Sequence, residues 1–323
     1  MTQSTMTTRS PFDDTDGDIV IRSSDEVEFR LYKNIIAKAS PVFQGMLTLP
    51  SGADAPEEPQ TVPLTEDADT LEALFRLCYP VERPRFTDFN RLRAVLEAAR
   101  KYEMGFVSTS LKDSLLQFIE TDPLRVYATG YILQFGDVAR AAARRLLEIP
   151  DFADPVPPPP EFTEIPAMAL HYVFEYRRKC AIAARSVLDN MDWMSDGDPG
   201  RRISIKKGNM TDTSGSWVWL SCPNKGYAIK DVIYLRIPLD DSVGRRPFYA
   251  APWWTKYIER IKGETGSRPF VKAVTDSITL EPFINEAMKC TTCAPKAWKD
   301  LTDFSQLLAE KIQEAVSKVE LPF

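Results

Sequence analysis

Residues 17–46 constrain the fold more than any other part of this chain. A short apolar run at 19–21 is followed by a polar turn at 23–26, and apolar and polar residues then alternate over 27–31. Alternation with a period of two is typical of a half-buried strand. The segment therefore predicts two short strands joined as a β-hairpin.

The apolar period changes immediately after the second predicted strand. The apolar residues at 35, 36 and 39 share one face of a helix, and Ser40 can cap a second helix that begins at Pro41. Proline is favoured at the first position of a helix because no hydrogen bond is lost there. Strand, strand, helix and helix are thus predicted within thirty residues.

This order of elements resembles the opening of a BTB/POZ domain. The residues that carry the resemblance are Asp18, Ile19, Val20, Phe29, Lys33, Ile36, Ala37, Ser40, Pro41, Val42 and Phe43. The family usually has a histidine where this chain has Tyr32. The resemblance extends over residues 14–121, with a third strand at 62–64 and helices at 68–79, 88–104 and 107–120. It implies an α+β fold in which helices cap a small β-sheet.

The resemblance also implies a non-enzymatic protein–protein interaction module that oligomerises or docks other proteins. The expected partners are a cullin scaffold, for which the chain would be a ubiquitin-ligase substrate adaptor, or another BTB chain. The alternative is a transcription or chromatin regulator whose carboxyl-terminal module contacts nucleic acid. The candidate partner surface comprises Leu47, Leu49, Asp54, Glu57, Glu58, Arg83, Arg85 and Phe86.

The rest of the chain divides at changes in composition. We expect a disordered tail over 1–13, a helical pair over 122–153 that packs on the BTB domain, and a linker over the proline-rich residues 154–160. A comparable helical pair helps animal BTB proteins to grip a cullin. A mostly helical module over 161–323 resembles the end of BTB proteins from mushroom-forming fungi.

Apolar spacing predicts the main elements of this last module. The expected elements are a helix over 166–194, a loop over 195–216, strands at 217–222 and 231–237, and helices beginning near 252, 280 and 301.

Charge and composition exclude several classes of function. Residues 1–154 carry 17 basic and 25 acidic side chains, whereas residues 155–323 carry 23 and 21. An acidic domain is repelled by phosphate backbones, so nucleic-acid binding is not expected there. No apolar stretch is long enough to cross a bilayer, and we expect a cytoplasmic or nuclear protein. The sequence contains no glycine-rich phosphate loop, so nucleotide-dependent chemistry is not expected, and we expect no small-molecule substrate.

A catalytic group of the Ser-His-Asp or Cys-His type would have to use His171, which is the only histidine in the chain. We interpret this residue instead as a helix histidine that is packed or hydrogen-bonded between domains. We therefore predict no catalytic residues.

The remaining candidate for chemistry is Cys222 together with Cys290 and Cys293, which have a C-x-x-C spacing. Two such thiols can bind zinc from one turn, and a complete site would need a fourth ligand from Cys180 or His171. Three interpretations stay open: a structural zinc site, a disulfide or redox pair, and buried inert thiols. No other cofactor is expected, and an odd number of widely spaced cysteines favours reduced thiols.

Overall fold

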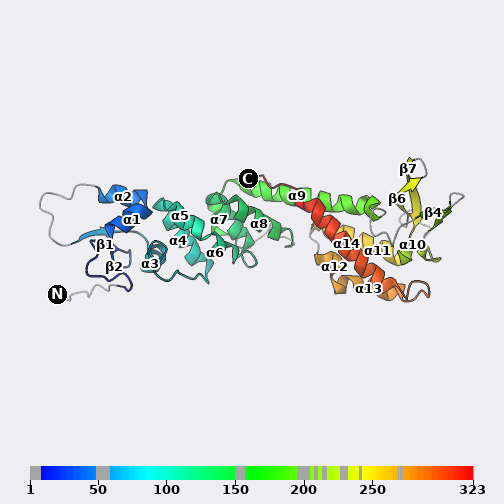
Figure 1. Ribbon diagram of the computed structural model, residues 1–323, viewed down its shortest axis with the longest axis horizontal. Helices are drawn as coiled ribbons and strands as arrows, with labels where there is room; N and C mark the ends of the chain where they lie inside the picture. Colours follow the sequence, from blue (N-terminus) through cyan, green and yellow to red (C-terminus); the bar gives the residue numbers. More distant parts are fainter. Residues whose placement is uncertain are drawn as a thin grey trace. The chain divides into compact units, whose positions relative to one another are not determined.

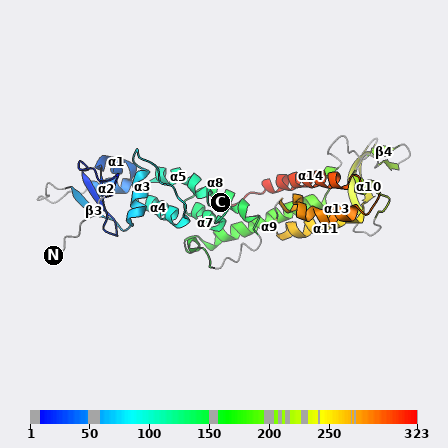
Figure 2. The same cartoon turned by 90° about the horizontal axis from the view of Figure 1, so that it is seen from below.

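The computed structural model, drawn in Figures 1 and 2, describes residues 9–48, 59–149, 157–194, 204–206, 210–212, 217–225, 232–239, 242–267, 269 and 272–322. The chain forms two compact units. The first unit comprises Met1–Ala142 and Pro159–Ile165, and the second comprises Ala143–Pro158 and Pro166–Phe323. Each unit is described by itself below.

The first unit contains a three-stranded sheet with the order β2-β1-β3. Its strands are β1 (Ile19–Arg22), β2 (Glu28–Leu31) and β3 (Gln60–Pro63). β1 pairs antiparallel with β2, with Ile19 opposite Leu31, and parallel with β3, with Ile19 opposite Gln60. The predicted hairpin is confirmed. The third strand begins two residues before its predicted start and ends one residue before its predicted end.

Short helices accompany this sheet, as expected for the predicted α+β class (Figure 1). They are α1 (Lys33–Ala39), α2 (Pro41–Leu47), α3 (Ala68–Arg76), α4 (Phe89–Lys101), α5 (Gly105–Ser110) and α6 (Lys112–Leu116). α2, α3 and α4 each begin after a side-chain cap, because Ser40, Asp67 and Asp88 accept a hydrogen bond from the backbone N–H three residues later. Their starting points are therefore encoded locally.

The core of the first unit includes an aromatic cluster to which the amino-terminal segment contributes. The ring of Phe12 is only 1% exposed, and its centroid lies 6.1 Å from that of Phe29 and 5.9 Å from that of Phe75. The carbonyl oxygen of Phe12 also accepts a 2.7 Å hydrogen bond from the backbone N–H of Arg30. Residues 9–13, which we had predicted to be part of a disordered tail, therefore belong to the folded unit.

Two further helices, α7 (Pro123–Ile132) and α8 (Gly136–Leu146), follow the sheet and its helices. Arg125 of α7 lies over the ring of Phe89, 4.3 Å from its centroid, and donates a 2.7 Å hydrogen bond to Asn90 Oδ1. Lys112 of α6 lies 3.1 Å from Asp137 Oδ1 at the start of α8. These contacts attach the helical pair to the preceding helices.

The segment after the proline-rich stretch returns to the first unit. It contains a short 3₁₀ helix, η1 (Pro160–Thr163), in which the side chain of Glu161 is completely buried. Glu161 Oε1 lies 2.7 Å from Arg125 Nη2 and 3.4 Å from Arg93 Nη1. The predicted linker thus ends in a folded turn, and the predicted boundary at residue 161 falls inside it. Residues 154–156 of that linker lie outside the described residues.

The second unit is mainly helical. Its helices are α9 (Ala167–Asp189), η2 (Asp192–Met194), α10 (Val218–Ser221), α11 (Pro252–Ser267), α12 (Lys272–Thr275), α13 (Ser277–Ala287) and α14 (Ala297–Ser317). Phe304 of α14 is completely buried and contacts the rings of Trp193, Trp217, Trp219, Trp254 and Tyr257, with centroids 5.2–6.3 Å away. The long helix that was predicted over 166–194 is α9 followed by η2.

Two antiparallel strand pairs accompany these helices. They are β4 (Ser204–Lys206) with β5 (Met210–Asp212), and β6 (Val232–Leu239) with β7 (Ser242–Tyr249). β6 confirms the strand predicted at 231–237. The loop predicted over 195–216 instead includes β4 and β5, and its other residues lie outside the described ones.

The strand predicted at 217–222 is wrong, because this segment forms the single helical turn α10. Trp and Val residues favour strands, but this preference is weak and depends on tertiary context. In the structure, the backbone N–H of Val218 donates a 2.9 Å hydrogen bond to Asp300 Oδ2 on α14. A carboxylate that is distant in sequence therefore caps this helical turn, which the local sequence does not predict.

None of the helices within the described ranges is both long enough and apolar enough to cross a membrane.

Candidate functional site

Within the Ser-Pro-Val-Phe segment, Ser40 and Phe43 hold α2 against the end of α4. The hydroxyl of Ser40 donates a 2.5 Å hydrogen bond to the carbonyl oxygen of Tyr102 and accepts one from the N–H of Phe43 at 3.1 Å. The ring of Phe43 stacks on that of Tyr102 with centroids 4.6 Å apart. Pro41 begins the helix and Val42 is half-buried. Ser40 and Phe43 therefore stabilise the fold through their contacts with Tyr102.

The earlier signature residues are also structural. Ile19, Val20 and Phe29 are buried in the sheet. Asp18 Oδ1 accepts a 2.6 Å hydrogen bond from the backbone N–H of Lys33, which joins the start of β1 to the start of α1. A carboxylate at this helix start also opposes the partial positive charge of the helix amino terminus. These signature residues thus stabilise the fold of the domain.

Tyr32 lies between β2 and α1. Its hydroxyl donates a 2.8 Å hydrogen bond to Asp16 Oδ1, and this interaction raises the pKa of Tyr32 to about 12. Its backbone N–H donates to the hydroxyl of Tyr79 at 2.8 Å. The neutral phenol of Tyr32 therefore makes the side-chain hydrogen bond at this position.

The eight residues of the candidate partner surface have different positions in the structure. Leu49, Asp54, Glu57 and Glu58 lie outside the described residues. Leu47 is half-buried at the end of α2, and both Arg83 and Arg85 are exposed. Phe86 is only 8% exposed, so little of its ring is available on this surface, and its role in docking stays a prediction. Its apolar ring is more favourably buried in the loop that presents the two arginines.

Arg83 and Arg85 line a groove of about 410 Å³ on the first unit, which we call the arginine groove. Its charged lining residues are Arg9, Arg76, Arg83, Arg85 and Arg91 together with Asp69, Glu72 and Glu82. They come from the amino-terminal segment, α3, the loop before α4, and α4. Sequence analysis missed most of them, because residues from separate segments share no local pattern.

Three of the groove arginines are bound to its acidic residues. Arg9 Nη1 lies 2.6 Å from Asp69 Oδ1, and Arg91 Nη2 lies 3.2 Å from Asp69 Oδ2. Arg76 Nε lies 2.8 Å from Glu72 Oε1. Asp69 thus pairs with two arginines. Glu72 does so as well, because its Oε2 also lies 3.0 Å from Arg9 Nε. The positive charge of these three arginines is therefore largely compensated within the groove.

Arg83 and Arg85 differ from the other groove arginines. Neither has a carboxylate within ion-pair distance among the described residues, and both side chains are exposed. An arginine guanidinium presents several N–H donors in a planar fork that matches the two oxygens of a carboxylate. The groove thus offers two uncompensated sites for acidic groups.

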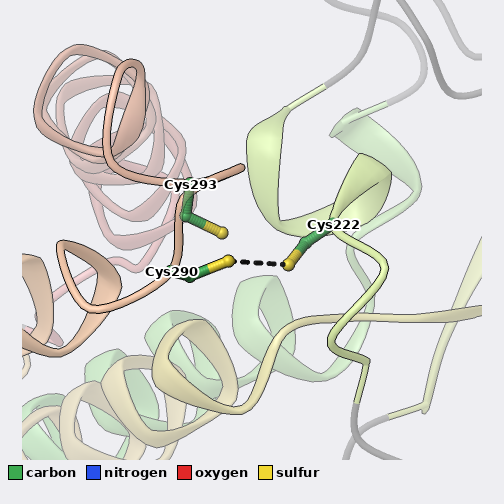
Figure 3. A group of neighbouring side chains, drawn as sticks. All are labelled: Cys222, Cys290 and Cys293. Carbon is green, nitrogen blue, oxygen red and sulfur yellow. Dashed lines mark hydrogen bonds between the residues drawn. The ribbon is translucent and has the colours of Figure 1, made fainter.

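The second unit contains the other candidate, a cluster of three thiols that we call the three-cysteine cluster (Figure 3). Cys222 follows α10, whereas Cys290 and Cys293 lie in the turn between α13 and α14. The three Sγ atoms all lie within 4.8 Å of one another, and those of Cys222 and Cys290 are 3.6 Å apart. The predicted trio is therefore brought together by the fold.

The environments of these thiols differ. Backbone N–H groups of Cys293 and Thr292 lower the pKa of Cys290 to about 7, against the opposing effect of burial. Burial raises the pKa of Cys293 to about 12. Trp253 Nε1 donates to Cys293 Sγ at 3.4 Å, and Asn224 Nδ2 donates to Cys290 Sγ at 3.5 Å. Two polar groups therefore already point at the sulfur atoms.

Neither predicted fourth ligand belongs to the cluster. Cys180 lies inside α9, where burial raises the pKa of its thiol to about 11. His171 is also outside the group of three and is exposed on α9, and its predicted position between domains stays a prediction. The described residues therefore supply three thiols and no fourth cysteine or histidine.

Comparison with known proteins identifies a domain in the first unit. The family model described as the BTB/POZ domain matches residues 12–119, about a third of the chain. The matched range begins at the buried Phe12. No curated protein matches the chain. The resemblance of residues 161–323 to fungal proteins stays a prediction. BTB/POZ domains are generally interaction modules and not enzymes, so the first unit contains a protein–protein interaction module.

Proposed function

We propose that this chain is a protein-interaction scaffold whose first unit captures partner proteins, and that the arginine groove receives an acidic segment of the partner. The observation that carries the proposal is the pair Arg83 and Arg85, two exposed guanidinium groups without carboxylate partners in the described part of a BTB/POZ unit. The surrounding sequence is acidic, so this local positive charge is conspicuous.

Charge complementarity favours an acidic partner segment. Basic and acidic patches that match across an interface accelerate association and suppress wrong partners. Arg9, Arg76 and Arg91 already pair with Asp69 and Glu72, so their guanidinium groups are less available to a second carboxylate. An incoming acidic group is therefore directed toward Arg83 and Arg85.

The size of the groove sets the scale of the contact. A volume of about 410 Å³ lies in the range of sites that hold a few side chains, and it is too small for a whole folded partner. A short extended segment with two acidic side chains fits this volume and the two arginines. Further contacts of a full partner would lie outside the groove.

We further propose that the bound complex belongs to a cullin-type ubiquitin ligase, in which this chain is the substrate adaptor. The support is the helical pair α7 and α8, which is attached to the preceding helices by the contact of Arg125 with Asn90 and that of Lys112 with Asp137. A helical pair in this position is what the resemblance to animal adaptors requires. A second copy of the chain is the other partner to test.

The test uses the full chain and a fluorescent peptide with two or more neighbouring Glu residues, compared with its Gln counterpart. The Arg83→Glu, Arg85→Glu double variant should weaken binding of the acidic peptide by at least about tenfold, the loss expected for reversed charge–charge contacts. The matched control is Lys38→Glu, Arg140→Glu, which makes the same charge change on exposed residues of α1 and α8. Equal losses in both variants, or equal binding of both peptides, would refute the groove as the docking site.

Further binding measurements distinguish a cullin adaptor, a self-associating chain and a nucleic-acid-binding protein. Sedimentation of the full chain with purified amino-terminal cullin domains tests the adaptor role, and sedimentation of the chain alone tests self-association. A chain that binds neither cullin nor itself would contradict the scaffold. Binding of duplex DNA that is lost in the Arg83, Arg85 variant would instead favour a nucleic-acid function, with the steep salt dependence typical of phosphate contacts.

A further inference from the structure

We propose that the three-cysteine cluster is a binding site for one soft divalent cation of the Zn²⁺ class, held by three thiolates and completed by an external fourth ligand. The site lies wholly in the second unit, and it does not depend on the function proposed for the first.

The sulfur spacing suits a metal better than a disulfide. Zn²⁺ binds thiolates at about 2.3 Å in a tetrahedral arrangement, so bound sulfur atoms lie on the order of 3.8 Å apart. The observed 3.6 Å between the Sγ atoms of Cys222 and Cys290 is close to that value, and Cys293 Sγ lies within 4.8 Å of both. A disulfide would require about 2.05 Å. Small side-chain adjustments would place all three thiolates around one ion.

The backbone around two of the ligands is already held in a tight turn. The N–H of Cys293 donates to the carbonyl oxygen of Cys290 at 3.1 Å, and the N–H of Ala297 donates to that of Cys293 at 2.8 Å. The first of these closes the C-x-x-C turn, and the second leads into α14. A turn that is formed in advance loses little conformational entropy when the ion binds.

The third ligand is positioned from a distant part of the sequence. Cys222 follows α10, whose first turn is fixed by the hydrogen bond from Val218 N–H to Asp300 on α14. The backbone N–H of Ala251 also donates to the carbonyl oxygen of Trp219 at 2.9 Å. Both contacts link α10 to other elements of the second unit and bring Cys222 to the turn.

Two polar groups next to the sulfur atoms suit the charge of such a site. Three thiolates around a divalent ion carry a net charge of about −1, and N–H donors to the sulfurs stabilise that charge. Trp253 Nε1 and Asn224 Nδ2 donate to Cys293 and Cys290, respectively. The indole N–H and the amide are thus in the positions that outer partners of a thiolate site usually occupy.

The fourth coordination position must be filled from outside the cysteine and histidine set. The chain has five cysteines and one histidine, and the described structure places Cys78, Cys180 and His171 outside the cluster. Cys222 and Cys293 are buried, whereas Cys290 is half-buried. Solvent therefore reaches the cluster at Cys290, and a water molecule or a small thiol would complete the coordination there. An open position distinguishes this site from a closed structural zinc site.

The test is metal uptake by the full chain after chelation under a reductant that does not bind metal. Cd²⁺ and Co²⁺ are the probes, because sulfur-to-metal charge-transfer absorption reports thiolate ligands and the Co²⁺ spectrum reports coordination geometry. We expect one equivalent to bind. Cys290→Ser should abolish this uptake, and Asn224→Ala should weaken it by about tenfold while retaining the charge-transfer band.

The matched controls are Cys78→Ser and Cys180→Ser, which remove thiols outside the cluster and should leave uptake unchanged. Far-UV circular dichroism checks that each variant folds, and Cys290→Ser is the preferred ligand variant because its side chain is only half-buried. Absence of stoichiometric uptake, or uptake that survives Cys290→Ser and is lost in Cys180→Ser, would overturn the proposal. A Cys222–Cys290 disulfide that forms readily, without uptake after reduction, would also overturn it.

Discussion

The two units differ in how far apart in the sequence their essential contacts lie. The first unit contains a hairpin and three helices that each follow a capping residue, whose side chain accepts a hydrogen bond from the backbone N–H three residues later. The second unit is organised around Phe304, whose neighbours come from η2, from the α10 region and from α11. Elements that are set by local signals, such as the hairpin and the capped helices, can be predicted from sequence, whereas contacts between distant segments, which build the core around Phe304, cannot.

The largest effect that would test this comparison is expected from Phe304→Ala. Removing a fully buried ring that contacts five aromatic rings should reduce the free energy of unfolding of the second unit by about 3–5 kcal/mol, toward the upper end. All six tryptophans of the chain lie in this unit, at positions 193, 217, 219, 253, 254 and 298. Tryptophan fluorescence during denaturant unfolding therefore measures the second unit selectively.

The matched control is Phe29→Ala, which removes a fully buried ring from the first unit. It should destabilise that unit by a similar amount and leave the tryptophan transition unchanged, while far-UV circular dichroism detects the loss. A tryptophan transition that shifts equally in both variants would mean that the two units unfold together. In that case, the distinction between them would have no thermodynamic meaning.

A smaller effect of about 3 kcal/mol is expected from Glu161→Gln in the first unit. The change leaves Arg93 and Arg125 without their buried carboxylate, and breaking a buried pair in this way is costly. The two arginine side chains are 11% and 18% exposed, so water reduces the loss to the lower end of the usual range. Amide hydrogen exchange in α4 and α7 measures it.

Glu97→Gln is the control for this prediction, because Glu97 also pairs with Arg93 but is 47% exposed. Its effect should stay below about 1 kcal/mol, as is usual for surface pairs. Equal effects would show that burial of Glu161 has no special role.

The ion pairs of Glu161 with Arg93 and Arg125 also predict that a fragment ending at residue 153 is less stable than one ending at residue 165, because the shorter fragment lacks Glu161.

The smallest effect is expected from Glu66→Gln. Burial tends to raise the pKa of Glu66, but hydrogen bonds from Lys101 and Tyr102 outweigh it and lower the pKa. A lowered pKa stabilises the folded state above the pKa of the unfolded chain, and this contribution is lost as pH falls through the folded-state pKa. At pH 7 the variant should be less stable by about 0.5–1 kcal/mol, allowing for solvent screening.

The difference between wild type and Glu66→Gln should shrink as acid is added, and denaturant unfolding at several pH values below 5 measures it. Lys101→Met should cost less in the Glu66→Gln background than in the wild type, because Lys101 Nζ donates to Glu66 at 2.6 Å. A stability difference that is constant with pH would contradict the assigned origin of the shift.

Local residues account for what the sequence predicted correctly. The hairpin follows from alternation over 27–31, and the start of α2 follows from Ser40 and Pro41, because each signal involves neighbours within four residues. The grouping of Cys290 with Cys293 was likewise visible as a C-x-x-C spacing. Their proximity to Cys222 was a hypothesis that only the folded second unit could test.

The misses share a long-range cause. Phe12 was assigned to a tail because its partners Phe29 and Phe75 are not its neighbours in sequence. α10 was predicted as a strand because its cap, Asp300, is 82 residues away. The arginine groove escaped prediction for the same reason, since separate segments contribute its ion pairs. The absence of a fourth cluster ligand also required knowing where α9 places Cys180 and His171.

Tyr32 has a consequence for how the BTB/POZ unit responds to acidification. A histidine at this position would gain a proton between about pH 7 and 6 and so change the local charge. The phenol that replaces it has a pKa of about 12 and stays uncharged throughout this interval. Tyr32 therefore adds no charge to this part of the domain over this interval, where a histidine would add one.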